Sequence, residues 1–154
     1  MSSSGVALTQ IGPLDMAVVS ALHAQCFGEG QWDERAVAEV FAMPGAFGFV
    51  ALKQDVPAGF VLARVAADEC EILSLGVCPA LRRAGLGRSL LKAAHDHAAA
   101  CGARATCLEV AEDNEAARRF YATEGFAVIG RRQAFYQRGN GRSTVALVLG
   151  RGST

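Results

Sequence analysis

Arginine and glycine are concentrated in one short segment, Arg82-Arg83-Ala84-Gly85-Leu86-Gly87-Arg88. The segment follows a stretch typical of a β-strand and precedes a stretch typical of a helix. Successive backbone N–H groups at a helix N-terminus bind anions, and glycines allow the backbone to approach the ligand and to adopt positive φ angles. The arginines add positive charge, so we expect a diphosphate group to bind here.

Two common phosphate-binding motifs do not fit this loop. A dinucleotide-binding fingerprint requires glycine at the sixth position of GxGxxG, where this chain has Leu90. A Walker loop requires GK[ST] at its end, and the sequence has none. The loop instead has the pattern R-x-x-G-x-G, and it follows a strand that ends in V-x-P. Glycines in such a turn can also be purely structural.

Three further residues have side chains suited to polar chemistry. Glu109 lies in a strand of otherwise apolar and small residues, where a carboxylate needs a partner, such as Arg104 or Arg118, or a chemical role. Asn114 and Tyr121 are seven residues apart, about two helical turns, and so share one helix face. Asn114 also suits a helix N-cap, and Tyr121 also suits core packing.

The elements that position these residues alternate between strands and helices. The strand from 71 to 77 should pair in parallel with that from 105 to 110 through a right-handed crossover, in a mixed α/β sheet. The expected strands are 6–11 (an edge strand), 47–52 and 58–65 (a hairpin), 71–77, 105–110, 126–129 and 145–149; the expected helices are 13–27, 33–41, 86–100 and 112–124.

Composition indicates one globular domain over residues 1–154, with frayed ends at 1–4 and 150–154. Just over half of the residues are apolar, and the formal net charge of +0 argues against binding to nucleic acid or membrane. No acid follows Glu124, whereas five arginines do, which makes either a solvated edge or a substrate-steering patch. The five cysteines lack CxxC spacing and no secretory signal is evident, so we expect a cytoplasmic protein without a metal site.

In combination, these motifs resemble a known superfamily. EILSLGVCPALRRAGLGRSLL (71–91) and LEVAEDNEAARRFYATEGF (108–126) are similar to the GNAT superfamily of N-acetyltransferases, and to its RimI-type branch of ribosomal-protein-alanine acetyltransferases. GRRQAFYQRGNGRSTVAL (130–147) continues the similarity, and CFGEGQWDERAVAEVF resembles the first two helices more loosely. The resemblance implies a splayed, roughly seven-stranded mixed sheet with helices on both faces.

The resemblance also implies how acetyl-CoA would be held. The loop from 82 to 88 would bind the pyrophosphate, and the strand end at Leu75, Gly76 and Val77 would bulge away from its neighbour to pair with the pantetheine arm. Gly76 fits such a bulge, and the Val77 N–H would donate to the thioester oxygen. A plain buried strand fits these residues equally well.

For the reaction, the resemblance makes Glu109 the general base, places Asn114 on the coenzyme A arm and places Tyr121 at the sulfur. Tyr136 would face the acceptor, and Phe27 and Trp32 would form the other wall of its groove. The implied function is acetyl transfer, without a covalent enzyme intermediate or a metal, to a protein N-terminal α-amine, a ribosomal protein being the suggested partner. Two alternatives stay open: a lysine or small-molecule amine as acceptor, and a non-catalytic module that binds coenzyme A.

Overall fold

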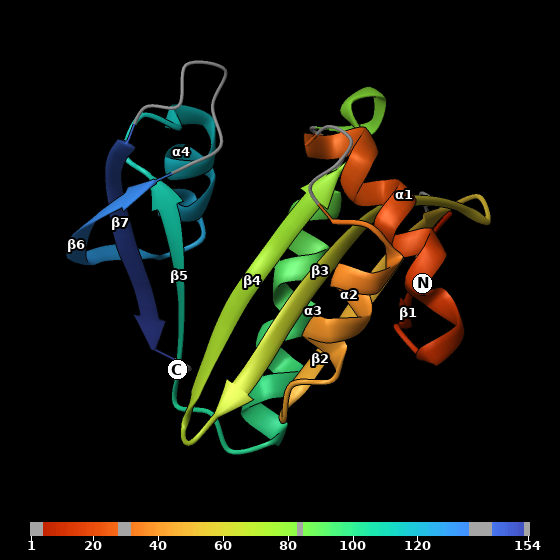
Figure 1. The fold of residues 1–154 in the computed structure, drawn as a ribbon, viewed down its shortest axis with the longest axis horizontal. Coiled ribbons are helices and arrows are strands. Elements are labelled where there is room, and N and C mark those ends of the chain that lie inside the picture. Colours follow the sequence, from red (N-terminus) through yellow and green to blue (C-terminus); the bar gives the residue numbers. More distant parts are fainter. Residues whose placement is uncertain (1–4, 28–31, 83–84, 136–142, 153–154) are drawn as a thin grey trace.

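The computed structural model describes residues 5–27, 32–82, 85–135 and 143–152, which form seven strands, four α-helices and two short 3₁₀ turns, at Pro13–Asp15 and Pro79–Leu81 (Figure 1). The strands are β1 (Val6–Gln10), β2 (Ala46–Lys53), β3 (Val56–Ala66), β4 (Glu69–Val77), β5 (Ala105–Ala111), β6 (Ala127–Phe135) and β7 (Ser143–Gly152). The helices are α1 (Met16–Phe27), α2 (Glu34–Phe41), α3 (Leu86–Ala100) and α4 (Glu115–Thr123).

The strands form a single sheet in the order β1-β2-β3-β4-β5-β7-β6, which confirms the expected mixed seven-stranded α/β fold. β1 is an edge strand, and β2 and β3 form the expected hairpin through Gln54 and Asp55. Both turn residues have positive φ, as a two-residue type I′ turn requires. The end of the chain differs from the expectation, because Gly152 pairs with Ala105 and residues 150–152 therefore belong to β7 rather than to a frayed end.

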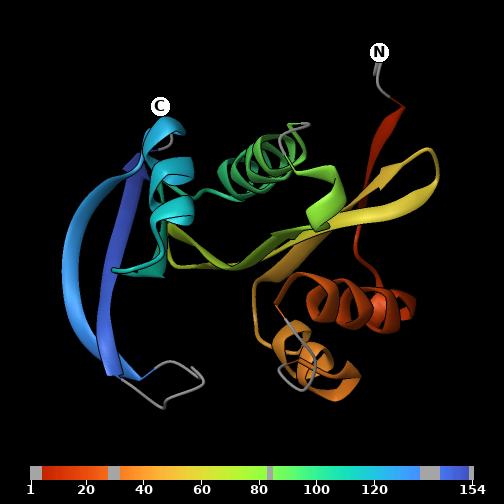
Figure 2. The same cartoon turned by 90° about the horizontal axis from the view of Figure 1, so that it is seen from above.

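Helices cover both faces of the sheet, with α3 and α4 on one side and α1 and α2 on the other (Figure 2). β3 is buried on both faces, because its side chains alternate between the two sides of the sheet and helices cover each side. Val61 and Ala63 pack in the cluster that contains α3, whereas Phe60 and Leu62 pack in the cluster that contains α1 and α2. α3 contributes one apolar stripe to its cluster, with the spacing of a single helix face: Leu86, Leu90, Leu91, Ala94 and Ala98.

β4 and β5 separate soon after they meet. They pair in parallel only where Glu69–Glu71 of β4 lies beside Ala105–Cys107 of β5, and the two strands then diverge toward their carboxyl ends (Figure 1). β5 continues to pair with β7 on its other side as far as Ala111. The splay expected for this sheet is therefore present, and it opens between two strands that each remain paired on one edge.

β4 carries a bulge, but not at the residue expected from the sequence. Ile72 lies opposite Ala63 and Ser74 lies opposite Leu62, so Leu73 is the extra residue. Gly76, which we expected to form the bulge, is paired in register with Phe60. Its lack of a side chain has another cause: a Cβ there would lie 2.9 Å from Cys26 Sγ of α1 and 3.0 Å from the Phe60 ring.

Candidate functional site

The end of β4 directs part of its backbone into the splay. Cys78 N donates to Ala58 O at 2.8 Å, and hydrogen-bonded pairs alternate with non-bonded pairs along an antiparallel ladder. The peptide groups of Gly76 therefore face β3, whereas the N–H and C=O groups of Leu75 and Val77 point away from it, toward β5. Arg82 Nε donates to Val77 O at 3.1 Å, which occupies one of these groups.

The edge of β5 that faces β4 has the same alternation of backbone groups. Glu112 N donates to Val145 O at 2.8 Å, so by alternation the backbone groups of Glu109 and Ala111 point away from β7 and toward β4. Asn114 N donates to Ala111 O at 3.0 Å. Two strand edges thus face each other across the opening, and an extended ligand can add to such edges as an extra strand.

The glycine loop leads from β4 into α3 and has the geometry expected of an anion site. Gly85 is the N-cap residue of α3 and has φ +82°, a left-handed conformation that favours glycine. Ser89 N donates to Gly85 O at 3.1 Å, so the N–H groups of Leu86, Gly87 and Arg88 precede the first intrahelical bond. The predicted loop residues Arg83 and Ala84 lie outside the described residues.

The start of α3 is packed against α4. A Cβ at Gly87 would lie 3.4 Å from the Phe120 ring and 3.9 Å from Leu75 Cδ2, so the loop, β4 and α4 meet at this glycine. Arg88 is largely exposed and its Nε lies 3.6 Å from Glu124 Oε1 at the end of α4. The start of α3 and the helix that carries Tyr121 therefore lie close together.

Tyr121 is packed in the core with only 8% of its surface exposed. Its ring makes edge contacts with Phe120 and Phe126, at centroid distances of 5.0 and 5.5 Å. Burial raises the pKa of Tyr121 to about 12. The phenol is therefore protonated at neutral pH, and it can donate a hydrogen bond.

Asn114 is the N-cap of α4, which was one of the two roles that its position in the sequence suggested. Its Oδ1 accepts a hydrogen bond from Ala117 N at 3.2 Å. This contact uses only the carbonyl oxygen of the side chain, and the Nδ2 group keeps its capacity to donate. The capping role and a role in ligand binding are therefore compatible.

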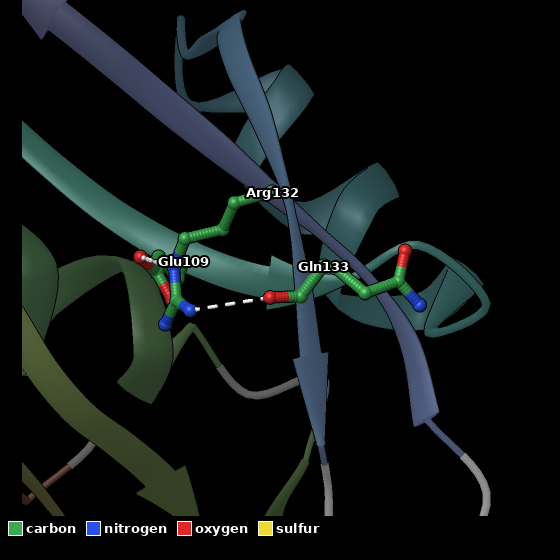
Figure 3. A network of polar contacts seen from close by, with 3 residues as sticks. All are labelled: Glu109, Arg132 and Gln133. Carbon is green, nitrogen blue, oxygen red and sulfur yellow. Dashed lines mark hydrogen bonds and ion pairs between the residues drawn. The ribbon is translucent and has the colours of Figure 1, made fainter.

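Glu109 forms a bidentate ion pair with Arg132 of β6 (Figure 3). Arg132 Nε donates to Oε2 at 2.7 Å and Nη2 donates to Oε1 at 2.6 Å. Sequence reasoning named Arg104 and Arg118 as partners and missed Arg132, because the pair depends on strand order. β7 lies between β5 and β6, and the register places both side chains on one face of the sheet.

Aromatic side chains gather at the carboxyl end of α1. Phe27 is 48% exposed, and His23 stacks on Trp32 with a centroid distance of 4.8 Å. No motif in the sequence singles out His23, whose burial lowers its pKa and whose Nδ1 has no hydrogen-bond partner among the described residues. Tyr136, the predicted residue of the opposite wall, lies outside the described part of the chain.

The described residues hold neither a metal-binding cluster nor a membrane-spanning helix. No group of three or more His, Cys, Asp or Glu side chains in these ranges has the arrangement of a metal site. Among the same residues, no helix combines the length and apolar character needed to cross a bilayer.

The splayed sheet and glycine loop belong to a known class of acetyltransferases. Residues 17–126 match the Acetyltransferase (GNAT) family, and the chain is a member of that family. Among its relatives is the N-alpha-acetyltransferase RimI of Mycobacterium tuberculosis, 32% identical over 121 residues that cover 75% of each chain. A [Ribosomal protein bS18]-alanine N-acetyltransferase of Haemophilus ducreyi is 29% identical over 97 residues, covering 63% of this chain and 67% of that one.

Solved structures show the same fold. The ribosomal-protein-S18-alanine N-acetyltransferase of Escherichia coli superposes with a TM-score of 0.86, at 23% identity, over 97% of this chain and 94% of that one. Arabidopsis thaliana NAA60 in complex with acetyl-CoA superposes with a TM-score of 0.81, at 19% identity, over 96% and 98% of the two chains. Family membership supports N-acetyltransferase activity with acetyl-CoA as co-substrate, and the open β4 edge and the loop at Gly85 fit that ligand.

The raised pKa of Tyr121 predicts a specific alkaline titration. The chain has two tyrosines, so the ultraviolet difference between wild type and Tyr121→Phe isolates Tyr121 in the folded protein, and we expect its tyrosinate absorbance to rise near pH 12 rather than near pH 10. Unfolded tyrosine loses its proton near pH 10, so the stabilisation present below pH 10 is lost between about pH 10 and 12. Relative to Tyr121→Phe, wild type should lose up to roughly 3 kcal/mol there, since one pKa unit corresponds to about 1.4 kcal/mol. A titration midpoint near 10 would contradict the burial argument.

Proposed function

We propose that this chain transfers the acetyl group of acetyl-CoA to the α-amino group of a protein N-terminus, and that the acceptor is a ribosomal protein. The observation that carries the proposal is the opening between β4 and β5, which has the backbone groups of Leu75 and the Val77 N–H on one side and Glu109 on the other. The names of the relatives support the acceptor class, since they describe α-amine and ribosomal-protein-alanine acetylation.

The binding part of the proposal rests on backbone groups. The pantetheine arm would pair with Leu75 and Val77 in place of a neighbouring strand, and Asn114 Nδ2 would donate to the arm from the other side. The diphosphate would accept hydrogen bonds from the N–H groups of the segment from 83 to 88, at the positive end of the α3 dipole. Arg82, just before this segment, and Arg88, at its end, are both exposed and add positive charge.

The chemical part assigns one proton transfer and two hydrogen bonds. Glu109 takes a proton from the α-amine, whose pKa of about 7.7–8.0 keeps part of it neutral at physiological pH. The Val77 N–H donates to the thioester oxygen as negative charge develops on it. The amine nitrogen bonds to the thioester carbonyl carbon, and the carbon–sulfur bond breaks. Tyr121 donates a hydrogen bond to the departing thiolate, which then takes a proton from water; a phenol with a pKa near 12 is suited to this hydrogen bond rather than to complete proton transfer.

The phosphate loop can be tested with two matched glycines of α3. Gly85 and Gly102 lie at opposite ends of the helix, and both have positive φ. Among the described residues, chain neighbours aside, a Cβ added at either glycine would meet no atom within 4 Å. Gly85→Val and Gly102→Val should therefore cost similar stability, about 1–2 kcal/mol. Only Gly85→Val should weaken acetyl-CoA binding in calorimetry, by roughly tenfold or more. Equal affinity of the two variants would refute the loop assignment.

Tyr121→Phe should lower turnover more than it lowers affinity for acetyl-CoA. The hydroxyl acts on charge that develops only as the thiolate leaves, so its loss affects the transition state and not the ground state. We expect kcat to fall by roughly tenfold or more while the Kd for acetyl-CoA changes less than about threefold. A wild-type kcat in a correctly folded variant would show that Tyr121 only packs the core.

Glu109→Gln tests both the base and the acceptor. We expect kcat/KM with an N-terminal alanine peptide to fall by roughly two orders of magnitude or more, the scale of losing a general base. Glu112→Gln is the control, because Glu112 is also ion-paired with an arginine of β6, Arg131, at 3.1 Å. Near-normal rates for Glu109→Gln would exclude it as the base. Mass spectrometry that finds acetyl on lysine side chains, with free N-termini unmodified, would exclude the proposed acceptor.

A further inference from the structure

We infer that Arg132 is a positioning residue, which fixes the Glu109 carboxylate in the orientation needed to take a proton from the acceptor amine. This inference rests on the proposed function, in which Glu109 is the base. Arg132 donates two short hydrogen bonds to the Glu109 carboxylate, at 2.7 and 2.6 Å (Figure 3). Its positive charge therefore lies directly beside the negative charge of the proposed base.

The geometry of the pair favours a positioning role. A fork of two parallel N–H donors fixes both the position and the plane of a carboxylate, which a single contact does not. The neighbouring pair of Arg131 and Glu112 offers a comparison: its contact joins Nη1 to Oε2 at 3.1 Å, which is longer than either contact of Arg132 with Glu109. Arg132 Nη1 also reaches the Gln133 carbonyl oxygen at 3.5 Å, so its guanidinium is held from the β6 side as well.

The pair lies on the open face of β5. Leu108 and Val110, the neighbours of Glu109 in the strand, are buried in the cluster that contains Tyr121 of α4. Side chains alternate along a strand, so Glu109 projects from the face opposite α4. One third of the Glu109 side chain is exposed, at 33%, together with 57% of the Arg132 side chain. An acceptor amine can therefore reach the carboxylate while Arg132 still holds it.

The charge of Arg132 also affects how the acceptor binds. At pH 7 most α-amines, and nearly all lysine side chains, are protonated. A carboxylate without a partner attracts any ammonium group and holds it in the unreactive protonated form. The fixed positive charge of Arg132 opposes a second cation at the same carboxylate and so disfavours this unproductive binding.

The test compares Arg132→Gln with Arg131→Gln, its neighbour in β6, on one peptide that has a free N-terminal alanine and one internal lysine. For Arg132→Gln we expect kcat for α-acetylation to fall by roughly tenfold or more, because the base loses its orientation. The KM for the peptide should stay level or fall, because the uncompensated carboxylate attracts cations. The ratio of α- to ε-acetylation, measured by mass spectrometry, should stay near that of wild type, because both reactions would use the same base beside the same charge.

Arg132→Lys separates position from charge. Lysine keeps the cation but cannot bridge both oxygens as a planar fork, so kcat should fall while the KM for the peptide stays near that of wild type. Arg131→Gln should leave both quantities unchanged, and the melting temperatures of all variants are measured alongside. An unchanged kcat in Arg132→Gln would overturn the inference, as would an equal fall in Arg131→Gln. A wild type that modifies no α-amine would instead refute the proposed function itself.

Discussion

The structure depends on one interrupted ladder of hydrogen bonds. β4 and β5 pair over three residues each and then part, although both strands continue for several more residues. Pairing them further would satisfy more backbone groups, so the separation has to be held by packing elsewhere. On the β4 side this packing comes from α3 and α1, which bury both faces of the neighbouring β3. On the β5 side it comes from α4 and from the full-length pairing with β7.

Contacts across the opening set its width. Gly87 brings the start of α3 within van der Waals distance of Phe120 on α4, and Arg88 lies near Glu124 at the end of the same helix. The residues proposed to bind the cofactor therefore lie on both halves of the sheet. A change in how α4 packs against the start of α3 would change the distance between Tyr121 and the glycine loop, so this distance depends on the helix packing and not on either strand alone.

The sequence predicted the structural features that depend on residues close together in the chain. The helix bounds of α3, the left-handed turn at Gly85 and the N-cap at Asn114 depend on residues close in the chain, and the structure contains all three. The expected strands were also found, with several of them longer than the pattern indicated. The parallel pairing of β4 with β5 followed from the strand–helix–strand order alone.

Features that depend on register and strand order were missed. The bulge lies at Leu73 and not at Gly76, because the register between β3 and β4 decides which residue is unpaired. The partner of Glu109 is Arg132, which is distant in sequence and is reached across β7. His23 became notable only through its stacking on Trp32 and its unpartnered Nδ1 within the described structure. None of these contacts has a signature in a single sequence.

The position of β7 has a consequence for biosynthesis. β7 follows β6 in the chain but lies between β5 and β6, and within the described sheet it is the strand with which β5 pairs beyond Cys107. While the chain is being made, β5 and α4 emerge before β7, so the backbone groups along one edge of β5 are still unpaired. Glu109 and Arg132 are then not yet held in one sheet. The half-site around Glu109 therefore cannot assemble until β7 has been synthesised, whereas the β1–β4 half can fold earlier.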